Sequence, residues 1–147
     1  MRAVTRLGDA LLIVVLAGLM FGCSGGSDNP SALKTALAEL TSVSPPAGAV
    51  QDGGGAHGCR RDDWEGDTEP SATADFRVAT EQGDGVLDLW YLPRWRDLGW
   101  VAVADQPGVV ERTVDGEAVR ANVQEMGKVG DQFAYSIVVD FVTDRCS

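Results

Sequence analysis

The last third of the chain alternates apolar and polar residues, a spacing typical of strands that are buried on one face only. Residues 109–114 and 117–125 alternate on either side of the dipeptide Asp115-Gly116, which favours a tight hairpin turn. Residues 100–104 are expected to form a further strand. The final strand places five apolar side chains on one face: Phe133, Tyr135, Ile137, Val139 and Phe141. This part of the sequence therefore predicts an antiparallel meander.

Leucines near residue 30 follow a helical spacing instead, because they recur at intervals of four and three: Leu33, Leu37 and Leu40. Asn29 and Pro30 suit the start of a helix, and the two prolines after Ser44 would end it. We therefore predict a helix over 31–42. The glycine-rich segment 47–58 that follows is expected to be an irregular linker.

The middle of the chain allows more than one interpretation. Residues 74–80 alternate as a strand does. Residues 85–98 carry apolar side chains at helical spacing, but Pro93 falls among them. That segment forms one kinked helix, two shorter pieces, or in part a strand over 86–92, and Gly99 is its expected end. Together the elements predict an α+β fold, with an antiparallel sheet of about four strands and helix packed on one face.

The N-terminal segment differs from the rest of the chain. Ala10 to Gly22 is an uninterrupted run of thirteen mostly large apolar residues, preceded by Arg2 and Arg6. The run is too short to span a bilayer, which takes about twenty residues of helix. A positive flank and a short apolar core are typical of a secretory signal peptide, so residues 1–22 are expected to be a leader.

The end of that run, Leu19-Met20-Phe21-Gly22-Cys23, resembles the lipobox of bacterial lipoproteins. The resemblance implies that Cys23 receives lipid, palmitate among the acyl groups, and becomes the N-terminus of a protein held on the extracytoplasmic face of the cell membrane. Ordinary signal-peptide cleavage after Ser24 is the alternative. With lipid on Cys23, residues 23–30 are expected to be a flexible tether, and residues 31–147 a single α+β domain.

Two cysteines remain once Cys23 is assigned to lipid, and they lie far apart in the sequence. In an oxidising compartment an even pair predicts a disulfide between Cys59 and Cys146. The alternatives are two buried thiols or metal ligands. With His57 as the chain's one histidine, the ligands are too few for a closed zinc site.

The formal charge of −10 bears on the class of partner. Nucleic-acid phosphates would be repelled, so no nucleic-acid partner is expected. Within the acidic run 62–69, carboxylates alternate as calcium ligands do, but Thr68 and Ala74 occupy the positions where a calcium loop has glycine and glutamate. A solvated acidic loop is the preferred interpretation, and no metal or cofactor is expected.

Candidate chemistry is sparse. His57 has the side chain of a general base, but no obvious nucleophile lies near it in sequence, and no catalytic residue is assigned. Trp90, Trp95 and Trp100 are spaced by five and are either core residues or a row that stacks on a glycan or a partner. Pro93 is expected to turn one of these side chains outward, and Trp95, two residues after it, is the candidate ligand contact.

The order of these pieces resembles a broad class of small uncharacterised actinobacterial lipoproteins. Shared features are the leucine-rich helix, the segment Pro45-Pro46-Ala47-Gly48, the early cysteine, the helix end at 95–100 and the last strand. The resemblance implies an address in the cell envelope and a similar fold, but no activity. The expected function is a non-enzymatic binding or interaction module with an envelope protein or cell-wall partner. A carrier of a small apolar or lipidic ligand, or a small extracytoplasmic hydrolase, is the alternative.

Overall fold

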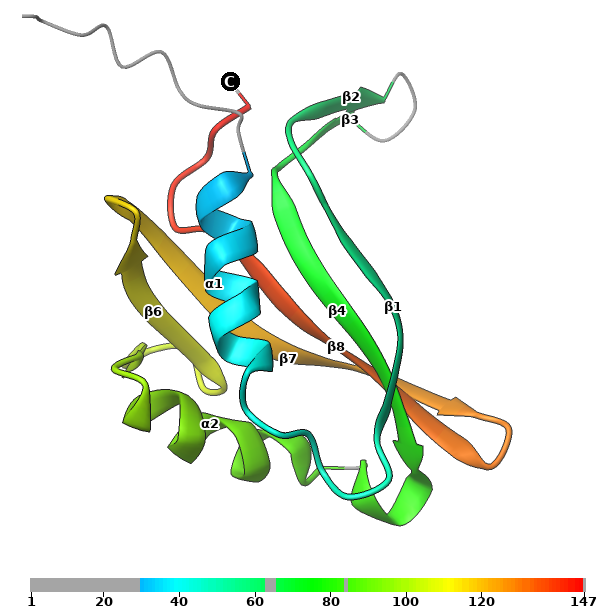
Figure 1. Cartoon of the computed structure of the whole chain (residues 1–147). Coiled ribbons are helices and arrows are strands. Elements are labelled where there is room, and N and C mark those ends of the chain that lie inside the picture. Colours follow the sequence, from blue (N-terminus) through cyan, green and yellow to red (C-terminus); the bar gives the residue numbers. More distant parts are fainter. Residues whose placement is uncertain (1–29, 63–65, 84, 147) are drawn as a thin grey trace, which may run out of the picture.

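The computed structural model describes residues 30–62, 66–83 and 85–146. Its main feature is one open antiparallel sheet of six strands, in the spatial order β1-β4-β8-β7-β6-β5 (Figure 1). The strands are β1 (Val50–His57), β4 (Ser71–Ala79), β5 (Val101–Ala102), β6 (Val109–Val114), β7 (Glu117–Val129) and β8 (Gln132–Phe141). The α+β class and the antiparallel sheet are confirmed, but the expected number of about four strands is too low.

The main strand that the sequence did not predict is β1, which occupies the segment expected to be an irregular linker. That prediction, over 47–58, is wrong. β1 pairs with β4 from Val50↔Arg77 to His57↔Ser71. Glycine has a low strand propensity, but pairing with β4 along the edge of the sheet outweighs it here. Beyond β1, a short hairpin of β2 (Arg60–Asp62) and β3 (Gly66–Thr68) leads back to β4.

Two α-helices and a short 3-10 turn complete the domain. α1 spans Ser31–Thr41, the turn spans Thr80–Gln82, and α2 spans Leu87–Asp97 as one continuous helix that contains Pro93. The C-terminus of α2 is closed by two backbone hydrogen bonds, from Gly99 N–H to Arg96 O at 2.9 Å and from Trp100 N–H to Trp95 O at 3.1 Å. Gly99 has φ of +90°, so the segment 95–100 forms the helix end that its sequence indicated.

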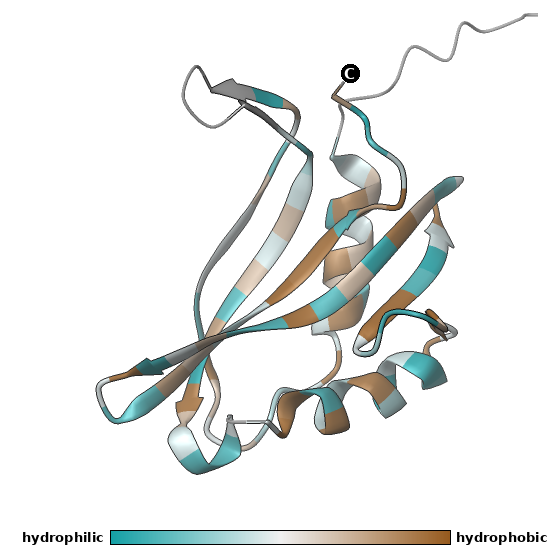
Figure 2. Cartoon of the chain, turned by 180° about the vertical axis from the view of Figure 1, so that it is seen from behind, coloured by the Kyte–Doolittle hydropathy of each residue, from teal (hydrophilic) through white to brown (hydrophobic). Residues whose placement is uncertain are grey.

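Both helices pack against the same face of the sheet, where Figure 1 shows α1 crossing the strands and α2 lying across their lower end. The largest fully buried side chains come mainly from both helices and the sheet: Leu33, Leu40, Val78, Leu87, Tyr91, Trp95, Trp100, Val110, Val119, Tyr135, Ile137 and Val139. The other face, seen in Figure 2, is not covered by either helix. That uncovered face is where polar side chains of neighbouring strands meet.

No helix in the described part of the chain is long and apolar enough to cross a membrane. The predicted leader, 1–22, and the predicted lipidation site, Cys23, lie outside the described residues.

Candidate functional site

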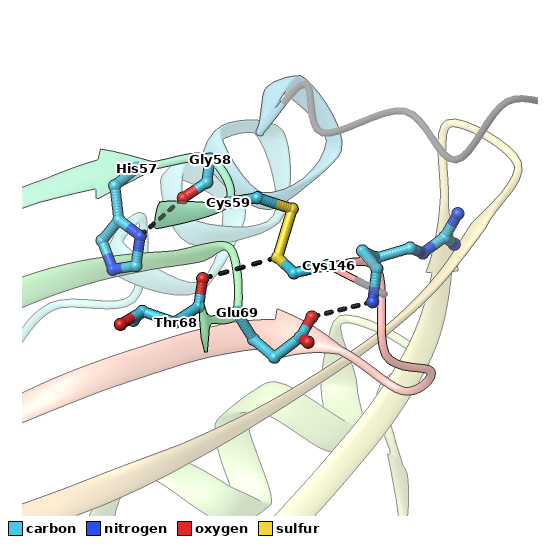
Figure 3. Close-up of a disulfide and its surroundings, with 7 residues drawn as sticks. His57, Gly58, Cys59, Thr68, Glu69 and Cys146 are labelled. Atoms are coloured by element: carbon cyan, nitrogen blue, oxygen red, sulfur yellow. Dashed lines mark hydrogen bonds between the residues drawn. A yellow bond between two sulfur atoms is a disulfide. The ribbon is translucent and has the colours of Figure 1, made fainter. Parts of the chain in front are cut away.

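The disulfide predicted between Cys59 and Cys146 is present in the structure, with the two Cα atoms 5.5 Å apart. It joins the end of β1 to the last residues of the chain, as Figure 3 shows. The backbone N–H of Arg145 also donates to Glu69 Oε2 at 2.8 Å, next to the start of β4. The bond closes a loop of 87 residues, which in the chain-entropy description contributes about 4–5 kcal/mol to stability. The disulfide and the hydrogen bond between Arg145 and Glu69 therefore both fix this corner of the sheet, which we call the disulfide corner.

His57 lies in the same corner, two residues before Cys59, and makes two hydrogen bonds. Its Nδ1 is 3.0 Å from the carbonyl oxygen of Gly58, drawn in Figure 3. Its Nε2 is 2.9 Å from Ser71 Oγ. A carbonyl only accepts, so in the neutral ring Nδ1 carries the proton and Nε2 accepts the hydroxyl proton of Ser71. The structure therefore supplies the hydroxyl partner for His57 that its sequence neighbours lack.

His57 and Ser71 are two members of a polar row that crosses five neighbouring strands on the uncovered face. Cross-strand register aligns His57 with Ser71, Ser71 with Asp140, Asp140 with Arg120 and Arg120 with Glu111. Arg120 Nε donates to Asp140 Oδ1 at 2.7 Å. Side chains directly opposite one another in antiparallel strands are within contact range, so the row is continuous. Sequence reasoning missed it because the register is not visible in any one segment.

A second feature lies along α2, where an open hollow of about 410 Å3 has mainly apolar walls. Leu89 is 75% exposed and Val86 is 41% exposed. The walls come from the loop after α1, the 3-10 turn and α2: Pro46, Ala47, Glu81, Gln82, Val86, Leu89 and Trp90. We refer to these residues as the α2 surface. An exposed apolar surface of this kind is typical of a contact with a partner.

Trp90 is the tryptophan that reaches this surface. It is half-buried, its Nε1 donates to Ser44 O at 3.1 Å, and the Arg94 guanidinium carbon lies 3.8 Å from its ring centroid. A stacked arginine and a held N–H keep the indole in one orientation. The surface thus combines an exposed aliphatic side chain, Leu89, with an aromatic one, Trp90, whose orientation is fixed by two contacts.

Trp95, the predicted ligand contact, does not lie at the surface. It is fully buried, and its Nε1 donates to Leu40 O at 3.3 Å. The side chains of Leu87, Tyr91 and Trp95 recur every four residues and face the core, whereas Pro93 itself is exposed. The expectation that Pro93 turns Trp95 outward is therefore wrong, because α2 continues through the proline without breaking this periodicity.

Two tyrosines form a buried polar contact between α2 and the sheet. The hydroxyl oxygens of Tyr91 and Tyr135 are 2.9 Å apart, and both side chains are fully buried. Burial raises the pKa of Tyr91 well above its usual range, and the hydrogen bond with Tyr135 raises it further. Burial also raises the pKa of Tyr135, although its hydrogen bond with Tyr91 opposes that shift. The two hydroxyls thus satisfy each other within the buried layer between α2 and the sheet.

The possible calcium loop falls partly on residues 63–65, outside the described residues. Within the described part of the chain, no cluster of three or more His, Cys, Asp and Glu side chains is placed to hold a metal ion.

Comparison of the chain with protein-family models, with curated proteins and with solved structures finds no match in any of the three.

Proposed function

We propose that this chain is a lipid-anchored binding module on the extracytoplasmic face of the cell membrane, and that it binds a protein partner through the α2 surface. The anchor is supported by Cys23, which directly follows an apolar leader-like run. Export is supported by the Cys59–Cys146 disulfide, since such bonds persist in oxidising compartments.

The exposure of Leu89 carries the binding part of the proposal. The core of the domain is complete without this side chain, because Leu87, Tyr91 and Trp95 fill the opposite side of α2. Burying Leu89 against a partner would contribute about 1.5–3 kcal/mol. Apolar surface that is exposed to water in the free domain would be removed from water when a partner binds, and this favours binding.

The lining of the α2 surface indicates the chemistry of the partner. Its polar members are Glu81 and Gln82, and the chain as a whole carries a charge of −10. An apolar side chain flanked by basic residues complements such a surface in both shape and charge. We therefore propose a protein segment of that composition as the partner.

Packing between α2 and the sheet favours this function over a carrier that holds its ligand beneath α2. A carrier needs interior space for its ligand. Here the layer between α2 and the sheet is filled by Tyr91, Trp95 and Tyr135, each with no exposed surface. The rings of Tyr91 and Trp95 have centroids 5.2 Å apart, and those of Tyr91 and Tyr135 lie 6.0 Å apart.

The test is site-specific photo-cross-linking in the native host, with the photoreactive residue at position 89. A matched control carries it at position 101, because Val101 is apolar and 67% exposed, close to the 75% of Leu89. We expect one defined protein adduct from position 89 that is missing from position 101. Binding of that protein should fall about 10–100-fold in Leu89→Asp, the loss expected for one buried leucine. Equal adducts from both positions, or full binding by Leu89→Asp, would contradict the proposal.

A further inference from the structure

We propose that Ser71 is a nucleophile activated by His57, and that this pair accepts acyl groups from carboxylic esters. The site goes beyond the binding role of the α2 surface and lies away from it, in the disulfide corner at the opposite end of the sheet (Figure 1).

The hydrogen bonds of His57 hold it in the form that a general base requires. A base must offer an unprotonated nitrogen to the nucleophile while its other nitrogen is held by a third group. Gly58 O binds Nδ1 at 3.0 Å, which leaves Nε2 free to accept from Ser71 Oγ at 2.9 Å. The Nε2–Oγ distance lies within the range in which a base and a nucleophile exchange a proton, roughly 2.6–3.2 Å.

The framework around the pair is rigid. His57 and Ser71 are directly opposite each other in paired strands, and Ser71 belongs to β4, which is paired on both sides. Cys59, which forms the disulfide with Cys146, follows His57 by two residues. A nucleophile and base held on strands need little reorganisation before reaction, which is a requirement for efficient attack.

The position of the pair also makes it reachable. Both side chains are half-buried. Ser71 alternates along β4 with Ala72 and Ala74, which are buried under the helices, so Ser71 and His57 opposite it lie on the uncovered face. The carboxylate of Asp140 follows Ser71 in the same row, on the neighbouring strand β8. Arg120 holds that carboxylate in place through its 2.7 Å contact.

The reaction follows from these groups. Ser71 Oγ attacks the carbonyl carbon of an ester while its proton passes to His57 Nε2. The bond to the leaving alcohol then breaks, and the alcohol oxygen takes the proton from Nε2, which leaves an acyl group on Ser71. Water, deprotonated by Nε2, attacks that acyl group and releases a carboxylic acid and free Ser71. Because the pair lies on the sheet face itself, we infer that the ester is one displayed on a larger molecule.

The test exposes the purified full chain to an alkyl fluorophosphonate, which reacts with activated serines, and locates the adduct by intact mass and peptide mapping. We expect one adduct, on Ser71, that is lost in Ser71→Ala and forms at least about 100-fold more slowly in His57→Gln. Thr73→Ala is the matched control, since Thr73 lies two residues along β4 on the same face without a histidine opposite it. Its labelling should equal that of the native chain.

A second readout uses p-nitrophenyl acetate, which should release nitrophenol in a burst while an acetyl group appears on Ser71. Absence of any adduct on Ser71 in the native chain, under conditions that fully label a serine hydrolase, would overturn the proposal. So would unchanged labelling in His57→Gln. Labelling is measured on the purified chain without any partner, so failure of the binding proposal and failure of this one are distinguishable.

Discussion

Tyr91 and Tyr135 illustrate how a polar contact is kept inside an apolar layer. Each hydroxyl has the other as its partner at 2.9 Å, so neither is left unsatisfied by burial. The ring of Tyr135 is also stacked on Phe76, with centroids 5.2 Å apart. Periodicity alone placed Tyr135 on the apolar face of the last strand. The contact with Tyr91 could not be predicted, because it depends on where α2 lies over the sheet.

The pair should respond to mutation non-additively. Tyr91→Phe alone leaves the Tyr135 hydroxyl buried without a partner, which should lower the free energy of unfolding by about 1–3 kcal/mol. Adding Tyr135→Phe removes the orphaned hydroxyl, so the double variant should recover much of that loss. Urea denaturation of both single variants and the double variant measures the coupling. Strictly additive losses would show that the two hydroxyls do not interact.

The same pair predicts a dependence of stability on alkaline pH. Both tyrosines have a pKa raised by burial, so above the usual tyrosine pKa of about 10 the unfolded chain loses these protons and the folded chain keeps them. Stability from the pair is thus fully present below about pH 10 and falls as the pH rises further. The chain has only two tyrosines, so tyrosinate absorbance reports this pair alone. Normal titration in the folded protein would contradict the burial argument.

At the scale of elements, β1 shows where sequence patterns stop being informative. Its glycines carry no alternation, and the strand exists because β4 pairs with it. The meander at the C-terminus was predictable, since its turn residues and alternation are local. The His57–Ser71 pair was not, because fourteen residues separate the two positions and only the register of β1 on β4 brings them together. A single helix was one of three interpretations of residues 85–98, because a proline inside a helical pattern usually ends or kinks the helix.

Two neighbouring glycines of β1 should differ in their tolerance of a side chain. Gly54 has φ of +126°, and a Cβ there would lie 2.4 Å from Thr73 O. Gly54→Ala should therefore destabilise the domain by about 1–3 kcal/mol. A Cβ on Gly55 meets nothing within 4 Å, so Gly55→Ala should change stability by less than about 0.5 kcal/mol. Thermal and urea unfolding compare them, and equal effects would mean that β1 does not pair with β4 as described.

At the scale of the whole molecule, the two candidate sites lie at different ends of one domain. The α2 surface lies across the lower end of the sheet in Figure 1, and the disulfide corner lies at its upper end. Binding at one end would therefore leave the groups at the other end uncovered by that partner. The proposed function requires that the chain is exported and lipid-anchored at Cys23.

The most direct test is the intact mass of the protein extracted from the membrane fraction of its native host, before and after reduction. We predict a chain that begins at Cys23 and carries the mass of a diacylglyceryl group and further acyl chains. Reduction should add the mass of the two hydrogens taken up by one disulfide. An unlipidated chain that begins near Gly25 and is found in the medium would contradict the anchor. A chain that keeps residues 1–22 and gains no mass on reduction would contradict both the predicted export and the Cys59–Cys146 disulfide.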